Sequence, residues 1–282
     1  MNNQVTISVV GCGWLGLPLA ESLIIKGYYV KGSTTTPQKL EILRNKGIEP
    51  YLVHFGDNTP LQLDQLMNCD VLIINIPPGR RSAEGPANYR RMADVMYKTL
   101  TPSRVKKVIL LSSTSVYSDT NTIVSETSTP EPDSEAGKLL LEVENQFLAI
   151  RNKQICVLRP AGLVGPGRHP GRFFKDKTRI PNGLAPVNLI HRDDVIGIIQ
   201  TMIENPGASG VYNACSPVHP TKQEFYTQAA ATLDMQAPDF IPEKKSYKII
   251  SSGRVYEELG YAYKYNNLID WLKDNQDPDI QN

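Results

Sequence analysis

A glycine-rich hexapeptide near the N-terminus, Gly11–Gly16, constrains the fold more than any other feature of this chain. It directly follows the apolar run Ile7–Val10 and opens a segment, Leu15–Ile25, in which apolar residues recur with helical spacing. A strand, a glycine turn and the start of a helix in that order are typical of a dinucleotide-binding unit. The hexapeptide therefore predicts an α/β fold with a nucleotide site at its first turn.

The three glycines have separate expected roles in such a turn. Gly11 allows the tight turn, Gly13 lets the backbone approach a pyrophosphate, and Gly16 lets the helix pack close to the strand. The pyrophosphate would lie at the helix N-terminus, where N–H groups and the helix dipole favour an anion. The cofactor site is therefore expected to include Gly11, Cys12, Gly13, Trp14, Leu15 and Gly16.

The same strand and helix rhythm continues along the chain. Strands are predicted at 28–33, 51–55, 71–76, 107–111 and 155–158, and helices at 87–100 and 135–150 and in a segment ending near Gly47. Several strands are continuous Val, Ile and Leu runs rather than alternating ones, which indicates burial on both faces. The predicted fold class is a doubly wound, parallel, Rossmann-type sheet with a small C-terminal substrate-side region.

The composition changes after Arg159-Pro160, where turn residues become frequent. We expect residues 1–164 to form the Rossmann domain, with 184–214 returning to it. Residues 165–183 and 215–282 would form the small substrate-binding region, with short helices at 222–233 and 254–259.

Charge and hydropathy exclude several classes of protein. The 30 Lys and Arg against 29 Asp and Glu give a net charge of +1 without a charged block. Nucleic acids and anionic membranes are therefore not expected as main partners. No run reaches the ~18 apolar residues of a membrane span, and the polar start lacks the regions of a signal peptide, so we expect a cytoplasmic protein. The four cysteines lack metal-ligand spacing, which favours buried reduced thiols and no metal site.

Five segments carry a resemblance when read in order. They are Gly11–Gly16; Ser112–Tyr117; Gly137-Lys138-Leu139 with Glu142; Arg159-Pro160-Ala161-Gly162 with Gly165-Pro166-Gly167; and Ile190–Val195. Together they resemble the extended short-chain dehydrogenase/reductase superfamily, the NAD(P)-dependent epimerases and dehydratases. The resemblance covers nearly the whole chain and is closest to an atypical, short branch.

The superfamily's chemistry uses a Tyr-x-x-x-Lys pair on one helix, where the lysine lowers the pKa of the tyrosine and binds the nicotinamide ribose. Lys138 matches the lysine, but Ser134 stands at the tyrosine position. Ser134 is more simply read as an N-cap of its helix. The resemblance implies that Ser113 contacts the substrate oxygen. Tyr117, close after it, is the best substitute proton donor, with a packing role for its ring as the alternative.

The end of the second strand decides between the two nicotinamide cofactors. An acidic residue about 20 positions after the glycines would bind the ribose 2′-OH of NAD. This chain has hydroxyls and a lysine there, which suit the 2′-phosphate of NADP better. We therefore expect NADP, with NAD as the open alternative. The expected contacts are Ser33, Thr34, Thr35, Lys39, Ile76, Pro77 and Lys138.

Loop cations are the candidates for substrate binding. Arg80, Arg168, His169 and Arg172 would clamp a phosphate or carboxylate of the substrate. Solvated loop cations are the alternative reading. His191 is expected to be structural, before a helix capped by Asp193 or Asp194.

Two functions remain open at this point. The first is an NAD(P)-dependent oxidoreductase, epimerase or dehydratase that acts on a small polar or anionic molecule such as a nucleotide sugar. The second is a non-catalytic NADP-binding sensor or scaffold that kept the cleft and lost its acid/base. A homodimer through helices 87–100 and 135–150 is also expected, with Leu139, Val143 and Phe147 as contact candidates.

Overall fold

The computed structural model describes residues 4–55, 62–79 and 84–274. The chain forms two compact units. The first comprises Met1–Val116, Pro132–Leu158 and Ile199–Val211, and the second comprises Tyr117–Glu131, Arg159–Ile198 and Tyr212–Asn282. Across the described ranges, no helix is both long and apolar enough to cross a membrane.

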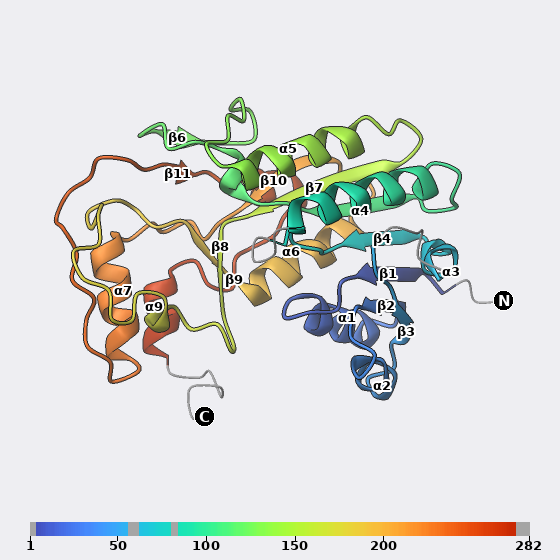
Figure 1. Ribbon diagram of the computed structural model, residues 1–282, viewed down its shortest axis with the longest axis horizontal. Coiled ribbons are helices and arrows are strands. Elements are labelled where there is room, and N and C mark those ends of the chain that lie inside the picture. The colour runs from blue at the N-terminus through green and yellow to red at the C-terminus, as the bar shows by residue number, and fades with distance from the viewer. Residues whose placement is uncertain (1–3, 56–61, 80–83, 275–282) are drawn as a thin grey trace. The chain divides into compact units, whose positions relative to one another are not determined.

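The main sheet has seven strands (Figure 1). They are β1 (Thr6–Val10), β2 (Tyr29–Thr34), β3 (Glu49–Leu52), β4 (Val71–Ile74), β5 (Lys107–Leu111), β7 (Gln154–Pro160) and β10 (Gly210–Ala214). Their order is β10-β7-β5-β4-β1-β2-β3, and every neighbouring pair from β3 to β7 is parallel. The chain order reverses between β1 and β4, which is where open α/β sheets bind ligands.

The central strands are buried along their whole length, as their apolar runs predicted. All residues of β4 and β5 are buried. One of them is charged: the Lys107 ammonium donates to the backbone oxygens of Met202 at 2.6 Å and Asn205 at 2.7 Å. Met202 lies in the last turn of α6 (Arg192–Glu204) and Asn205 directly follows that helix, so the helix dipole also stabilises the ammonium. The predicted doubly wound parallel sheet is confirmed.

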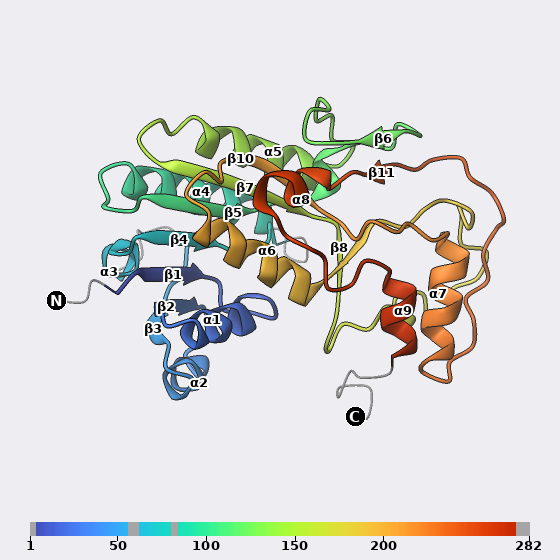
Figure 2. The ribbon, with the colours of Figure 1, turned by 180° about the vertical axis from the view of Figure 1, so that it is seen from behind.

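Helices cover both faces of this sheet. Figure 1 shows α4 (Gly85–Leu100) and α5 (Glu135–Leu148) on one face and α1 (Gly16–Ile25) and α2 (Lys39–Asn45) on the other. A short helix, α3 (Leu63–Met67), precedes β4. Figure 2 shows the end of α6 beside α1, where Gln200 donates to Ser22 at 3.0 Å.

The packing of α5 within the chain contradicts the predicted dimer contacts. Leu139, Val143 and Phe147 lie four positions apart and are at most 2% exposed. Because the chain's own core covers these three side chains, they are not available to a second copy. The dimer itself stays a prediction.

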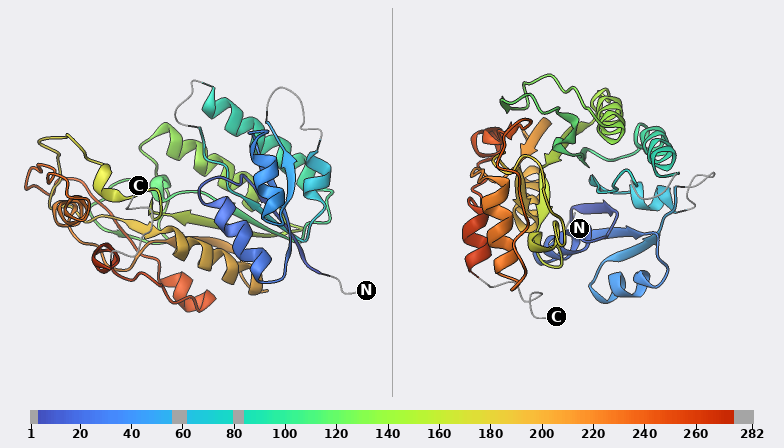
Figure 3. Two further views of the ribbon diagram at one scale, coloured as in Figure 1. Left: turned by 90° about the horizontal axis from the view of Figure 1, so that it is seen from below. Right: turned by 60° about the vertical axis from the view of Figure 1, so that its left-hand side comes forward.

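The second unit is built from short elements. Its strand pairs are β6 (Ile123–Val124) with β11 (Ile249–Ile250) and β8 (Gly162–Val164) with β9 (Leu189–His191), both parallel. Its helices include η2 (Pro170–Arg172), α7 (Lys222–Ala231), α8 (Gly253–Leu259) and α9 (Leu268–Lys273), whereas η1 (Thr114–Val116) ends the first segment of the first unit. Figure 3 shows α7 and α9 side by side, with Phe225, Ala229, Leu268 and Leu272 in their shared core.

The two units divide the chain differently from the expected boundaries. Residues 165–183 and 215–282 belong to the second unit, which also takes in 117–131, 159–164, 184–198 and 212–214. Strand pairing explains the difference, because β8 is joined to β9 and β6 is joined to β11.

Candidate functional site

The glycine turn after β1 is formed by close backbone approach. Gly11 has φ +100°, and a Cβ there would lie 2.6 Å from the backbone oxygen of Asn75. Its N–H donates to the Ser33 hydroxyl at 3.0 Å, and the N–H of Cys12 donates to the Ser33 carbonyl at 2.8 Å. The expected role of Gly11 in a tight turn is consistent with this geometry.

Gly16 and Gly13 differ in what a side chain would meet. A Cβ on Gly16 would lie 2.1 Å from the Gly11 carbonyl oxygen, so α1 can approach the turn only without one. A Cβ on Gly13 would meet no described atom within 4 Å. The fold therefore requires glycine at positions 11 and 16, whereas at position 13 packing within the chain gives no reason for it.

The N-terminus of α1 begins directly after this turn. No side chain caps it, and no acidic residue lies in its first turn. The positive end of the helix dipole is therefore not neutralised from within the helix, and it favours a negatively charged group beside Gly13.

A cavity of about 550 Å³ opens at the carboxyl ends of β1 to β4. It is lined by Gly11, Cys12, Gly13, Ser33, Thr34, Thr35, Thr36, Lys39, Val53, His54, Phe55, Asn75, Ile76, Pro77, Gly79, Gly85, Asn88, Tyr89 and Met92. Nine residues expected in the cofactor site thus share one cavity: Gly11, Cys12, Gly13, Ser33, Thr34, Thr35, Lys39, Ile76 and Pro77. Burial raises the pKa of the Cys12 thiol to about 12, so it is an inert wall group.

The hydroxyls at the end of β2 have different uses. Ser33 and Thr34 are buried, and they accept the backbone N–H groups of Gly11 at 3.0 Å and Thr36 at 3.1 Å. Thr35 and Lys39 are exposed within the cavity lining. Among the polar residues expected in the cofactor site, Thr35 and Lys39 are thus the two that are exposed in the cavity lining.

The expected cofactor lysine, Lys138, lies outside this lining. Its ammonium pairs with Glu135 at 2.8 Å, and its side chain is 59% exposed. Ser134 accepts the N–H of Gly137 at 3.1 Å and is the N-cap of α5, as expected. The tyrosine position of the superfamily's pair is therefore occupied by a capping serine.

The two other catalytic candidates are engaged within the chain. The Ser113 hydroxyl accepts the N–H of Ser115 at 3.1 Å, at the start of η1. Tyr117 is 3% exposed; its hydroxyl accepts from Arg159 at 2.6 Å and donates to Asn213 at 3.1 Å. Burial raises the pKa of Tyr117.

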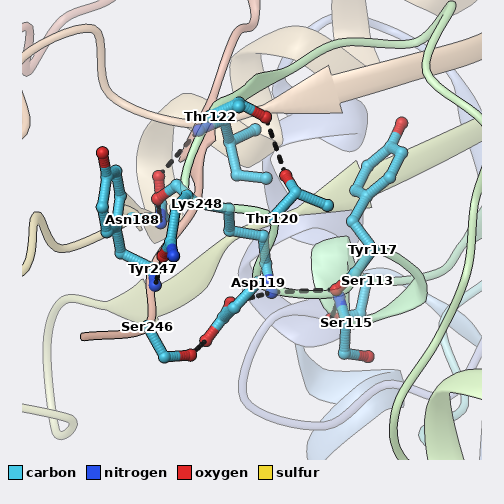
Figure 4. Close-up of polar contacts among 12 residues, drawn as sticks. Ser113, Ser115, Tyr117, Asp119, Thr120, Thr122, Asn188, Ser246, Tyr247 and Lys248 are labelled. Atoms are coloured by element: carbon cyan, nitrogen blue, oxygen red, sulfur yellow. Dashed lines mark hydrogen bonds and ion pairs between the residues drawn. The ribbon is translucent and has the colours of Figure 1, made fainter.

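Figure 4 shows a second group of contacts after Tyr117. The Lys248 ammonium donates to the Tyr117 carbonyl and to Asp119, both at 2.9 Å, and Ser246 donates to Asp119 at 3.0 Å. Neither Lys248 nor Arg159 was expected from the sequence, because each lies far along the chain from the residue that it binds. These contacts hold the segment that follows Tyr117.

The structure describes three of the four substrate candidates, Arg168, His169 and Arg172. His169 accepts the N–H of Gly171 at 3.2 Å and begins η2, and burial lowers its pKa. Arg168 and Arg172 are exposed. Arg80 lies outside the described residues. The structure thus gives His169 a local capping role and leaves the arginines as predictions.

His191 is buried, as its expected structural role requires. Burial lowers its pKa to about 4, and its ring packs 4.2 Å from that of Tyr265. The expected capping role of Asp194 is wrong. Its carboxylate instead accepts from the Tyr261 hydroxyl at 2.8 Å and from the backbone N–H of Lys264 at 2.7 Å.

Metal binding finds no support in the described ranges, which hold no group of three or more His, Cys, Asp and Glu side chains suited to an ion. All four cysteines are buried free thiols, as expected.

Comparison with known proteins places the chain. It is 40% identical to protein YeeZ of Escherichia coli strain K12 over 264 residues, which is 92% of this chain and 96% of YeeZ. The chain belongs to the YeeZ family. No model of a protein family matches it.

Solved structures share the predicted fold. A functionally unknown conserved protein from Silicibacter pomeroyi is 26% identical, with a TM-score of 0.74 over 96% of this chain and 98% of that one. UDP-glucuronic acid 4-epimerase from Bacillus cereus, in complex with NAD, is 20% identical, with a TM-score of 0.81 over 98% of each chain. The YeeZ-family chain thus shares the fold of this epimerase, which is the fold that the predicted resemblance implied.

Proposed function

We propose that this chain binds NADP(H) in the cavity of its first unit. The observation that carries the proposal is Gly13, which lies beside the uncapped N-terminus of α1 and has open space where its side chain would be. A glycine that packing does not require is explained by a ligand whose pyrophosphate approaches the backbone.

The preference for NADP rests on the edge of the cavity formed by β2. Thr35 and Lys39 are exposed there, and no Asp or Glu occurs among the described residues of the lining. A lysine and a hydroxyl can donate hydrogen bonds to a 2′-phosphate, whereas the ribose diol of NAD is best held by a carboxylate acceptor.

The reaction we propose is NADP-dependent oxidoreduction, epimerisation or dehydration of a small polar or anionic substrate, with a nucleotide sugar as first candidate. Support comes from the fold shared with the Bacillus cereus epimerase, whose complex with UDP-glucuronic acid and NAD is known. Ser113 would contact the substrate oxygen, Tyr117 would transfer the proton, and Lys138 would bind the cofactor ribose. Arg80, Arg168, His169 and Arg172 would hold the anionic part of the substrate. We expect the protein in the cytoplasm.

Three contacts favour a second function, that of a non-catalytic NADP sensor or scaffold. The Tyr117 hydroxyl already bonds to Arg159 and Asn213, and Lys138 pairs with Glu135. For catalysis, these groups would have to exchange their present partners for cofactor and substrate. The two functions share the cofactor site and differ only in turnover.

The experiment is isothermal titration of the protein with NADPH, NADP, NADH and NAD, beside the Lys138→Ala variant. We expect the phosphorylated pair to bind more tightly and the variant to weaken both. Nucleotide sugars are then screened for turnover with Tyr117→Phe as the test of the proton donor. Failure of all four dinucleotides to bind the folded protein would remove the proposal.

A further inference from the structure

We infer that His54 is a second hydrogen-bond donor to the 2′-phosphate of NADP, beside Lys39, and that it strengthens the preference for NADP over NAD. The inference rests on the proposed function and adds a residue that determines cofactor specificity.

Strand pairing places His54 close to the end of β2. β2 and β3 are parallel, with Thr34 opposite Leu52, and the N–H of Val53 donates to the Thr34 carbonyl at 3.0 Å. The chain that leaves β3 at Val53 and His54 therefore runs beside the chain that leaves β2 at Thr35. This is the edge at which the 2′-phosphate is expected.

The helix after β2 brings Lys39 to the same edge. The N–H of Lys39 donates to the Thr36 carbonyl at 3.0 Å, which starts α2 directly after the turn. Lys39 and His54 are both exposed, and both line the cavity. Two donors from the segments that follow the neighbouring strands β2 and β3 thus border one space.

The charges of the lining fit a dianion. Its titratable groups, as far as the described residues go, are Lys39, His54, the Cys12 thiol and the Tyr89 phenol. Burial raises the pKa of both Cys12 and Tyr89, so these two stay neutral. No described carboxylate of the lining competes with a phosphate for Lys39 and His54.

His54 also differs from the other histidines. His169 and His191 are buried, and His219 lies 3.1 Å from the Val187 carbonyl through Nδ1. The His54 side chain is exposed, and its imidazole carries a ring N–H that can donate to a phosphate oxygen.

The test is titration of wild type, His54→Ala and His54→Lys with NADPH and NADH. We expect His54→Ala to bind NADPH about fivefold more weakly, close to the value for one hydrogen bond, with NADH unchanged. His54→Lys should keep the tight NADPH binding, because an ammonium group also donates to a phosphate oxygen.

Lys98→Ala is the matched control, because it removes one exposed donor side chain from α4 outside the cavity lining. Equal NADPH affinity of wild type and His54→Ala would overturn the inference and leave the proposed function standing. So would an equal loss for NADH and NADPH. If wild type bound no dinucleotide, the proposed function would fail instead.

Discussion

Gly13 and Gly16 allow the fold and the cofactor site to be tested separately by the same substitution. In Gly16→Ala, the added methyl would lie 2.1 Å from the Gly11 carbonyl oxygen, more than an ångström inside normal contact. The backbone of α1 or of the turn has to move. We expect a loss of about 3 kcal/mol in the free energy of unfolding, at the upper end for overpacking.

Gly13→Ala should have the opposite pattern. No described atom lies within 4 Å of the added methyl, and the φ angle of Gly13 is not left-handed. The substitution should therefore leave stability unchanged or raise it by about 0.5 kcal/mol, because alanine restricts the unfolded chain. The methyl would meet the pyrophosphate, however, and cost about 1.4 kcal/mol or more, which is at least a tenfold loss of NADPH affinity.

The assay is urea unfolding of both variants, followed by isothermal titration with NADPH at a temperature where each is folded. Stable Gly13→Ala protein that binds NADPH within about twofold of wild type would refute the reasoning about the ligand. Unchanged stability of Gly16→Ala would refute the packing argument.

Three further predictions concern specificity and stability. Thr35→Asp should place a carboxylate at the exposed end of β2 and reverse the preference from NADPH to NADH in titrations; a retained preference for NADPH would contradict the assignment of this edge. Burial lowers the pKa of His191 from 6.5 to about 4, so the unfolded chain takes up a proton that the folded chain refuses. The contribution of the neutral His191 imidazole to the free energy of unfolding is complete above pH 6.5, and about 3 kcal/mol of it is lost as pH falls toward 4. In urea unfolding, His191→Gln should therefore lose less stability over that range than wild type. Asp194→Ala removes the acceptor of the Tyr261 hydroxyl and of two backbone N–H groups, so unfolding should become easier by about 3 kcal/mol, and a loss under about 0.5 kcal/mol would contradict the importance of this carboxylate.

Local patterns predicted the part of the site that depends on neighbours in sequence. The turn at Gly11–Gly16, the cap at Ser134 and the continuous buried strands all follow from spacing over a few residues. The same reasoning brought nine cofactor residues to one cavity, because parallel strands end at one edge.

Contacts between distant segments could not be predicted from the sequence. Arg159 and Asn213 bind the Tyr117 hydroxyl from 42 and 96 positions away, and no local pattern pairs them. The hydrogen-bond partners of Asp194 were likewise not predicted, since they lie 67 or more positions further along the chain. The Asp194 carboxylate therefore binds a distant segment of the chain instead of capping its own helix.

An error in a strand boundary hid His54. The predicted strand at 51–55 treats His54 as a residue within the sheet, whereas β3 ends at Leu52. His54 therefore lies just past the carboxyl end, where ligands gather. A shift of three residues thus separates a strand residue from a candidate ligand.

The most direct test of the account is a crystal structure of the protein with NADPH. We expect the pyrophosphate beside Gly13 at the N-terminus of α1 and the 2′-phosphate within hydrogen-bonding distance of Lys39. NADPH bound elsewhere, or an empty cavity at saturating NADPH, would contradict the central claim.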